Sequence, residues 1–390
     1  MPATRSITLL SAGHACVDVY QGAVAALVPF FIAERAYTYA AASGLVLAAS
    51  LLSSVAQPLF GTLTDRRALP WLLPASTIVS GLGIAMSGVT GSYALTLVVV
   101  ALSGIGIAAY HPESARAARV ASHGSHTAMG WFSLGGNVGF AVAPLVVAAV
   151  IATGGLRLSP LLMVPALAGS ALCLPAMRAL GRPVRQPRST GRARADDTGS
   201  FIKLSLAVAC RSVAFIGLST FIAVYAQQRA SGGPIAGMAA LCVLYLGGAV
   251  GTVLGGRLAR RWDRVQIVRR AYLATTVAVA GIVTVPGPAL YLFVALASVG
   301  LYIPFSLQVT LAQDYLPSRV GTASGITLGL AVSVGGLLAP VIGRVADATS
   351  LQLALSPLIV MPALSWLLFR TLPEPAVLLA RGGRDHKSNP

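Results

Sequence analysis

The chain has 390 residues, of which 56% are hydrophobic and only 10% are charged, and its mean hydropathy is +0.78. This composition leaves too little polar surface to cover a soluble globule, so it indicates an integral membrane protein. A formal net charge of +17 would suggest nucleic-acid binding in a soluble chain, so the placement of the 28 Lys and Arg residues must decide between these classes.

Twelve apolar runs are each long enough, at roughly 20 residues, to cross a ~30 Å hydrocarbon core as a helix. In chain order they are predicted at 6–32, 39–63, 70–90, 93–115, 127–152, 158–178, 201–227, 235–259, 266–285, 289–312, 320–344 and 351–372. We therefore expect an all-α integral membrane protein with twelve transmembrane helices. The chain divides into an N-terminal six-helix bundle at 1–180, a cytoplasmic linker at 181–200, a C-terminal six-helix bundle at 201–372 and a cytoplasmic tail at 373–390.

The basic residues lie mainly in alternate loops. If the N-terminus is cytoplasmic, Arg35, Arg157, Arg229 and Arg344 fall in outer loops, Arg211 lies within a span, and all the others are cytoplasmic. Such a bias predicts that both termini are in the cytoplasm of a multi-pass plasma-membrane protein. The positive charge is therefore an orientation signal, and nucleic acid is not an expected partner.

Two sequence elements repeat half a chain apart. The segment Gly61-Thr-Leu-Thr-Asp-Arg-Arg67 after the second span matches Gly256-Arg-Leu-Ala-Arg-Arg-Trp262 after the eighth. A Gly/Pro element on the fifth span, Gly139 to Pro144, matches Gly335 to Pro340 on the eleventh. Repeated halves of this kind are typical of transporters built from tandem helical bundles.

These motifs carry a resemblance to a known family. The Gly61–Arg67 segment resembles the loop motif of the major facilitator superfamily, and the Gly139–Pro144 element resembles the Gly/Pro-rich motif of its antiporters. Within that superfamily the chain is similar to the fosmidomycin resistance protein group of drug exporters, through Gly13-His14-x-x-x-Asp18-x-Tyr20-Gln21-Gly22, His111-Pro112-Glu113 and Gly321-x-x-Ser324-Gly325-x-x-x-Gly329.

The resemblance implies a gate at Asp65 and Arg66, because the corresponding Asp in the superfamily contacts the start of the eleventh helix and closes the cytoplasmic side. Two departures limit what carries over. The second loop motif has Arg260 where the first has Asp65, and the arginine that drug antiporters often carry early in the fourth span is missing near Val100. Proton coupling through that arginine is therefore excluded.

A polar face on the first span is the clearest chemical signal. Asp18 lies about 11 residues into the span, or roughly 16 Å deep at 1.5 Å per residue. A charge at the bilayer centre costs at least ~2.5 kcal/mol unless it faces a wet cavity or a partner. His14, Asp18 and Gln21 share this face, which we expect to line a central cavity. The alternative for Asp18 is a hydrogen-bonded strut between helices of the first bundle.

Arg211 lies at a similar depth in the seventh span. It is expected to meet Asp18 across the cavity or to flank a bound substrate, and a purely structural ion pair or a snorkelling side chain is the alternative. Asp18 is a candidate proton carrier, as are His111 and Glu113 on the fourth span, with pairing of Glu113 to Arg116 or Arg119 as the alternative for that residue. Further candidates for substrate hydrogen bonds are Asn137 and Gln308, which otherwise join helices.

Other function classes lack a signal. The four cysteines, Cys16, Cys173, Cys210 and Cys242, are scattered singly within spans and predict neither disulfides nor a metal site, and no phosphate-binding loop is present. We expect no enzyme activity, no cofactor and no bound metal.

The sequence and the resemblance together predict a secondary active transporter working by alternating access. The leading interpretation is proton-coupled efflux by antiport of a small drug-like or anionic, phosphonate-like compound. The alternatives are a proton- or sodium-coupled symporter that imports a sugar or organic acid, and a non-transporting membrane sensor on the same fold. Expected partners are the small-molecule substrate, protons and membrane lipid, and we expect a monomer.

Overall fold

The computed structural model describes residues 3–123, 125–179, 196–230 and 232–375. In the first half, the helices are α1 (Ala3–Arg35), α2 (Tyr39–Arg66), α3 (Leu72–Ser87), α4 (Tyr93–Ser122), α5 (His126–Ile151), and the 3₁₀ helix η1 (Leu156–Met163), which continues into α6 (Val164–Ala179). In the second half they are α7 (Thr198–Arg229), α8 (Gly233–Leu258), α9 (Arg264–Thr284), α10 (Ala289–Tyr315), α11 (Val320–Ala348), α12 (Leu351–Leu355), η2 (Ser356–Ile359) and α13 (Val360–Phe369).

The prediction of an all-α membrane protein is confirmed. Eleven helical stretches among the described residues are long and apolar enough to cross a membrane, and α12, η2 and α13 form one of them. The remaining helix, α3, is apolar but has only 16 residues. It is shorter than the span predicted at 70–90. Most of the predicted linker and tail lies outside the described residues, and α7 begins at Thr198.

Hydroxyl side chains define where several helices begin. Thr38, Ser92, Ser125 and Ser350 each precede a helix and accept a hydrogen bond from the backbone N–H three residues later. This contact satisfies one of the donors that the first turn of a helix leaves unpaired. The caps thus fix the first residue of each of these helices.

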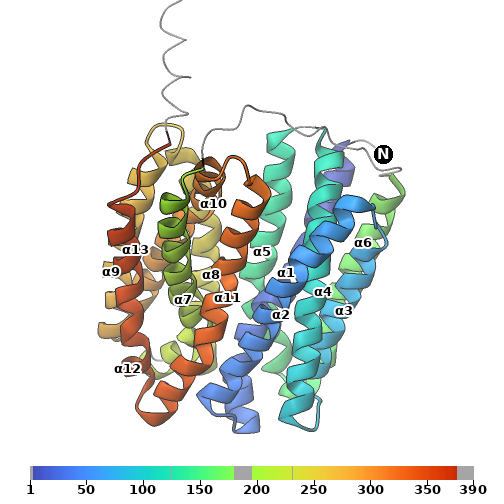
Figure 1. The fold of residues 1–390 in the computed structure, drawn as a ribbon. Helices are drawn as coiled ribbons and strands as arrows, with labels where there is room; N and C mark the ends of the chain where they lie inside the picture. The colour runs from blue at the N-terminus through green and yellow to red at the C-terminus, as the bar shows by residue number, and fades with distance from the viewer. Residues whose placement is uncertain (1–2, 124, 180–195, 231, 376–390) are drawn as a thin grey trace, which may run out of the picture.

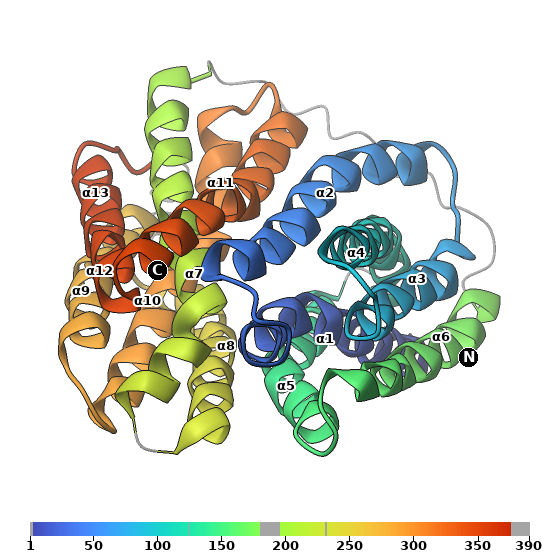
Figure 2. The ribbon, with the colours of Figure 1, turned by 90° about the horizontal axis from the view of Figure 1, so that it is seen from below.

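The helices form two six-helix bundles that lie side by side (Figures 1 and 2), one built from α1 to α6 and the other from α7 to α13. In the first bundle α1 packs against α4, α5 and α6, and in the second α7 packs against α8, α11 and α13. The bundles contact each other mainly through α2 with α11 and α5 with α8. Both α1 and α7 therefore lie next to the boundary between the bundles.

The repeated Gly/Pro element makes the same contact in both bundles. A Cβ atom at Gly139 on α5 would lie 2.0 Å from the backbone oxygen of Ala15 on α1. A Cβ atom at Gly335 on α11 would lie 2.3 Å from the backbone oxygen of Ser212 on α7. Only glycine permits so close an approach of two helix backbones. The sequence repeat thus corresponds to a repeated helix–helix contact.

Gly139→Ala should lower the thermal stability of the purified protein, because the added methyl group forces α1 and α5 apart. Overpacking of this kind costs about 1–3 kcal/mol. Gly130→Ala is the matched control, since a Cβ atom at this position of the same helix would have no atom within 4 Å, and the substitution should gain helix propensity. Equal melting temperatures for the two variants in detergent would contradict the proposed close packing.

The bundles touch closely at one end of the molecule. We call it the α1–α2 end, because α1 ends and α2 begins there (bottom of Figure 1). Asp347, near the end of α11, accepts hydrogen bonds from the backbone N–H groups of Tyr39 (2.7 Å) and Ala40 (3.0 Å), and Gln228 of α7 donates to the Tyr39 hydroxyl (3.0 Å). The α11 carboxylate thus caps a helix of the other bundle.

Small residues continue this contact along α2 and α11. A Cβ atom at Gly343 would lie 2.7 Å from the backbone nitrogen of Ala40, and one at Gly336 would lie 2.1 Å from the Ser50 hydroxyl. Nearer the opposite end, where α6 ends and α7 begins, Gly325 and Gly329 of α11 face open space. We call this the linker end. The bundles are therefore closed at the α1–α2 end and more open along α11 toward the linker end.

Candidate functional site

Three predicted residues come together at the centre of the first bundle. His14 and Asp18 lie one turn apart on α1, and His111 reaches them from α4. The Nε2 atom of His14 lies 3.3 Å from one Asp18 carboxylate oxygen, and the Nε2 atom of His111 lies 3.2 Å from the other. His14 and Asp18 are each 8% exposed. We call these three residues the His–Asp–His cluster.

The two histidine rings are oriented by backbone carbonyl groups. The Nδ1 atom of His14 lies 3.0 Å from the Phe132 carbonyl oxygen, and the Nδ1 atom of His111 lies 2.8 Å from that of Ile107. Because a carbonyl oxygen can only accept, Nδ1 carries the hydrogen in both rings. Both histidines therefore present Nε2 to the Asp18 carboxylate.

Helix α5 covers the cluster from a third side. The ring of Phe132 stacks on His14 with centroids 4.4 Å apart. A Cβ atom at Gly136 would lie 2.5 Å from an Asp18 carboxylate oxygen and 2.8 Å from His14 Nε2. Glycine at this position lets α5 approach the cluster without displacing it.

Arg211 of α7 is the buried cation of the second bundle. It is 2% exposed, it donates one hydrogen bond to the Leu301 carbonyl oxygen (3.3 Å), and its guanidinium carbon lies 5.2 Å from the centre of the Phe305 ring. Its Nε atom has no hydrogen-bond partner, and no carboxylate within the described part of the chain forms an ion pair with it. Of the two expected arrangements, a direct contact between Arg211 and Asp18 is not formed, and the Asp18 oxygens face His14 and His111 instead.

Aromatic side chains surround Arg211. The Phe305 ring, over which the guanidinium lies, is 6.1 Å from the Tyr302 ring, and Tyr302 in turn lies edge-on to Phe215 of α7 at 5.1 Å. The repeated glycine contacts align Ala15 of α1 with Ser212 of α7, so His14 and Arg211, each one residue earlier, hold equivalent positions. Each bundle thus carries a buried basic residue at the corresponding position of its first helix.

The remaining predicted residues are more dispersed. Glu113 is fully buried and forms an ion pair with Arg116 one turn later, which is the structural alternative considered from the sequence. Gln308 is buried and donates to the Tyr272 hydroxyl at 2.7 Å, which places it beside the Arg211 environment. Gln21 is exposed on α1, and Asn137 is half-buried on α5. Neither of these two residues is part of the cluster.

The predicted gate residues lie at the linker end. Asp65 belongs to the last turn of α2, but its side chain is outside the described part of the structure, as is that of Val320 at the start of α11. Arg66 is described and exposed. The gate therefore stays a prediction.

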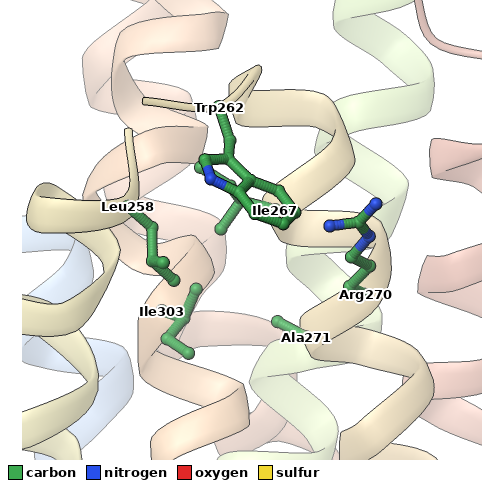
Figure 3. Close-up of a pocket in the computed structure, with 6 residues that line it drawn as sticks. All are labelled: Leu258, Trp262, Ile267, Arg270, Ala271 and Ile303. Atoms are coloured by element: carbon green, nitrogen blue, oxygen red, sulfur yellow. The ribbon is translucent and has the colours of Figure 1, made fainter. Parts of the chain in front are cut away.

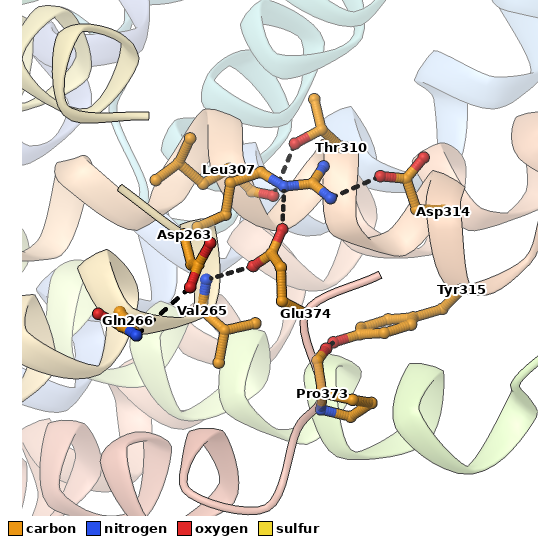
Figure 4. A network of polar contacts seen from close by, with 10 residues as sticks. Asp263, Val265, Gln266, Leu307, Thr310, Asp314, Tyr315, Pro373 and Glu374 are labelled. Carbon is orange, nitrogen blue, oxygen red and sulfur yellow. Dashed lines mark hydrogen bonds and ion pairs between the residues drawn. The ribbon is translucent and has the colours of Figure 1, made fainter. Parts of the chain in front are cut away.

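A second polar network lies at the linker end of the second bundle (Figure 4). Arg264 at the start of α9 forms ion pairs with Asp314 of α10 (2.7 Å) and Glu374 (2.8 Å), and Glu374 also accepts from the Val265 N–H at 2.9 Å. The Tyr315 hydroxyl donates to the Pro373 carbonyl oxygen. These contacts fix the segment after α13 against α9 and α10, which indicates a structural role.

Next to α7, hydrogen bonds from the Ser318 hydroxyl and N–H hold the pKa of Asp196 below its ordinary value. Asp196 lies 3.9 Å from the exposed Arg319 side chain as well. The segment before α7 is therefore attached to the turn between α10 and α11.

A small apolar cavity of about 210 Å³ lies among α8, α9 and α10 (Figure 3). It is lined by Leu258, Trp262, Ile267, Arg270, Ala271 and Ile303. The Arg270 guanidinium lies 4.5 Å from the centre of the Trp262 ring. None of the predicted site residues lines this cavity, so it is separate from the candidate site.

Sequence reasoning missed Phe132, Gly136, Tyr272, Tyr302 and Phe305 as members of the site. Aromatic residues and glycines are common in membrane helices for packing alone, so single residues of these types give no functional signal. A search for glycines and aromatics at the depth of Asp18 and Arg211 would have selected some of them.

Comparison with known proteins agrees with the fold. The chain is 28% identical over 368 residues to the fosmidomycin resistance protein of Escherichia coli (strain K12), which covers 92% of this chain and 90% of that protein. It is similarly 28% identical over 368 residues to the uncharacterized MFS-type transporter YfnC of Bacillus subtilis (strain 168), with 91% and 90% covered.

The solved structure of the nucleoside transporter NupG superimposes with a TM-score of 0.77 at 12% identity, over 95% of this chain and 99% of that one. Residues 10–340 match the profile of the Major Facilitator Superfamily. A match over most of the chain, together with the two six-helix bundles, means that this multi-pass membrane protein belongs to the major facilitator superfamily of secondary transporters and is not an enzyme.

Proposed function

We propose that this transporter exports a small anionic, drug-like compound in exchange for protons. The observation that carries the proposal is Arg211, a cation that is 2% exposed and has no described carboxylate partner. The name of the Escherichia coli relative, a fosmidomycin resistance protein, supports efflux of a drug as the direction of transport.

The substrate charge follows from the cost of burying Arg211. Removing a guanidinium group from water costs several kcal/mol unless another charge compensates it. A planar guanidinium forms two parallel hydrogen bonds with phosphonate, phosphate or carboxylate groups. The free Nε atom leaves hydrogen-bonding capacity for such a group. Gln308, Asn137 and Gln21 are the proposed neighbours that contribute neutral hydrogen bonds to the substrate, and His14 is a further proposed contact whose charge depends on the proton of the cluster.

Proton coupling is assigned to the His–Asp–His cluster. With hydrogen on both Nδ1 atoms, contact between Nε2 and the Asp18 carboxylate is attractive only when Nε2 also carries a cation, and a proton is the simplest one. Loss of the proton weakens the link between α1 and α4. Glu113 is a second proton carrier in this proposal, although its ion pair with Arg116 separates it from Asp18.

Alternating access follows if residues 1–180 rock against 200–372 around this midplane site, with 181–200 as the linker. With both termini in the cytoplasm of the plasma membrane, the described conformation is closed toward the outside. In the opposite conformation Asp65 and Arg66 close the cytoplasmic side against the start of α11. A single chain carries all of these parts, in keeping with a monomer.

Asp347→Ala should shift the population away from the conformation closed at the α1–α2 end. It removes the carboxylate that caps α2 across the bundle boundary, a contact worth about 1 kcal/mol, which is roughly a fivefold change in an equilibrium constant. The distance between spin labels at exposed Ala33 and Ala348, in a cysteine-free background, measures the shift. Asp347→Asn keeps one acceptor and should give an intermediate result, whereas wild-type distances in Asp347→Ala would rule out this latch.

Vectorial flux in proteoliposomes tests the proposed function. We expect a phosphonate to leave the compartment that corresponds to the cytoplasm, and we expect this flux to require a gradient that drives protons in the opposite direction. Uptake of a sugar or organic acid together with protons or sodium would support the symporter instead. Absence of flux for all these substrates in correctly oriented, folded protein would favour a sensor.

A further inference from the structure

We propose that the His–Asp–His cluster is a binding site for a divalent transition-metal ion of the zinc class. The ligands are Nε2 of His14, Nε2 of His111 and the Asp18 carboxylate, and the three ligand atoms lie within 4.8 Å of one another. The inference does not depend on the identity of the substrate, but the metal ion and the proposed coupling proton would compete for the same atoms.

The tautomers of both histidines are those of metal ligands. Each ring donates Nδ1–H to a backbone carbonyl oxygen, that of Phe132 or Ile107, so Nε2 faces the cluster and offers a lone pair to a metal ion whenever the coupling proton is absent. A histidine that binds a metal almost always donates its other ring N–H to a carbonyl or carboxylate in this way, which fixes the ring orientation. Two rings on different helices, α1 and α4, have this arrangement.

The separations within the cluster also fit a metal ion. Zinc bonds of about 2.0–2.1 Å in a tetrahedral arrangement place neighbouring ligand atoms about 3.3 Å apart. His14 Nε2 lies 3.3 Å from one Asp18 oxygen and His111 Nε2 lies 3.2 Å from the other, so each imidazole is at the ligand-to-ligand separation from one oxygen of the shared carboxylate. At these distances His14 Nε2 and the Asp18 Oδ1 atom are buried, yet neither makes a hydrogen bond with a described residue. A metal ion would provide these two buried atoms with the partner that the described residues do not supply.

The ligand types select the class of ion. Two imidazoles and one carboxylate suit Zn²⁺ and the neighbouring transition metals, whereas Mg²⁺ and Ca²⁺ prefer sites built from oxygen alone. Three protein ligands leave a fourth position for water or an anion. The His111 side chain is 25% exposed and the Asp18 side chain 11%, so the fourth position opens on the His111 side.

Cobalt provides the direct test, because Co²⁺ in a tetrahedral site has strong visible absorption and can be displaced by Zn²⁺. The full-length protein is purified in detergent with a tag that contains no histidine. The wild type should bind one Co²⁺ per chain with a tetrahedral spectrum. His14→Gln, His111→Gln and Asp18→Asn should each weaken binding at least about tenfold. His123→Gln, at the exposed end of α4, is the matched control and should bind as the wild type does.

Gly136→Ala provides a second test that leaves all three ligands in place. Its added methyl group would lie 2.5 Å from an Asp18 oxygen, so it should displace the carboxylate and weaken Co²⁺ binding, whereas Gly130→Ala on the same helix should not. Thermal unfolding of each variant establishes that it is folded.

The inference is overturned if the folded wild type gives no tetrahedral Co²⁺ spectrum, or if the spectrum persists in the His14→Gln/His111→Gln double variant. Phosphonate flux measured in the presence of a metal chelator tests the proposed function separately. Either proposal can therefore fail without the other.

Discussion

Asp18→Asn should reduce accumulation of substrate driven by a proton gradient to the background level. Within the described part of the chain, Asp18 pairs with the Nε2 atoms of both cluster histidines, and the amide is nearly isosteric but carries no charge to hold a protonated imidazole. The measurement is substrate accumulation in proteoliposomes after a pH jump. Asp263→Asn, an exposed aspartate before α9, is the matched control and should transport normally.

The same variant should retain exchange of labelled for unlabelled substrate when no gradient is applied, because exchange requires binding and conformational change but no net proton movement. Loss of both activities would mean that Asp18 binds the substrate or supports the fold. Accumulation at the wild-type rate would place the proton carrier elsewhere, and Glu113→Gln would then be the variant to measure.

Arg211→Lys should weaken transport of an anionic substrate at least about tenfold, a loss of about 1.4 kcal/mol or more. Lysine keeps the charge but lacks the planar pair of donors that matches a phosphonate or carboxylate group. Initial rates over a range of substrate concentrations give the change in apparent affinity. A neutral compound, if it is transported, should be little affected. Arg229→Lys at the end of the same helix is the control.

The competing role for Arg211 is to neutralise Asp18 in another conformation. In that case substrate charge should not matter, and the Asp18→Asn/Arg211→Gln double variant should be more stable than either single variant. Equal losses for anionic and neutral substrates in Arg211→Lys would favour this role. The described structure gives no direct contact for it, since the Asp18 oxygens face His14 and His111.

The sequence predicted the helices well because hydrophobic length is a local property. Helix α3 is the exception, since apolar loop residues on both sides extend its run beyond the helix Leu72–Ser87. The pairing of His14 with Asp18 also follows from one-turn spacing on a helix. By contrast, the partner of Arg211 depends on how α7 is rotated against α10, and sequence spacing holds no information on that rotation.

The contact made by His111 could not be predicted from the sequence either. The sequence marked it as a proton carrier on its own helix, but the contact with Asp18 arises because α4 and α1 pack at a depth that places the two side chains together. The convergence of three metal-ligand types was therefore not visible from the scattered positions 14, 18 and 111, and the sequence predicted no metal site.

Helix α11 turns adjacent glycines toward two different bundles, Gly335 toward Ser212 and Gly336 toward Ser50. Packed helices normally interlock through side chains that fit into grooves on the partner helix. Glycines have no such side chains, so the two bundles can move past each other at this surface without first separating. Resistance to the movement is then concentrated in a few polar contacts at the ends, such as that of Asp347 with the first turn of α2. Larger residues in place of Gly335 or Gly336 would therefore slow turnover, although these positions are not part of the proposed substrate or proton site.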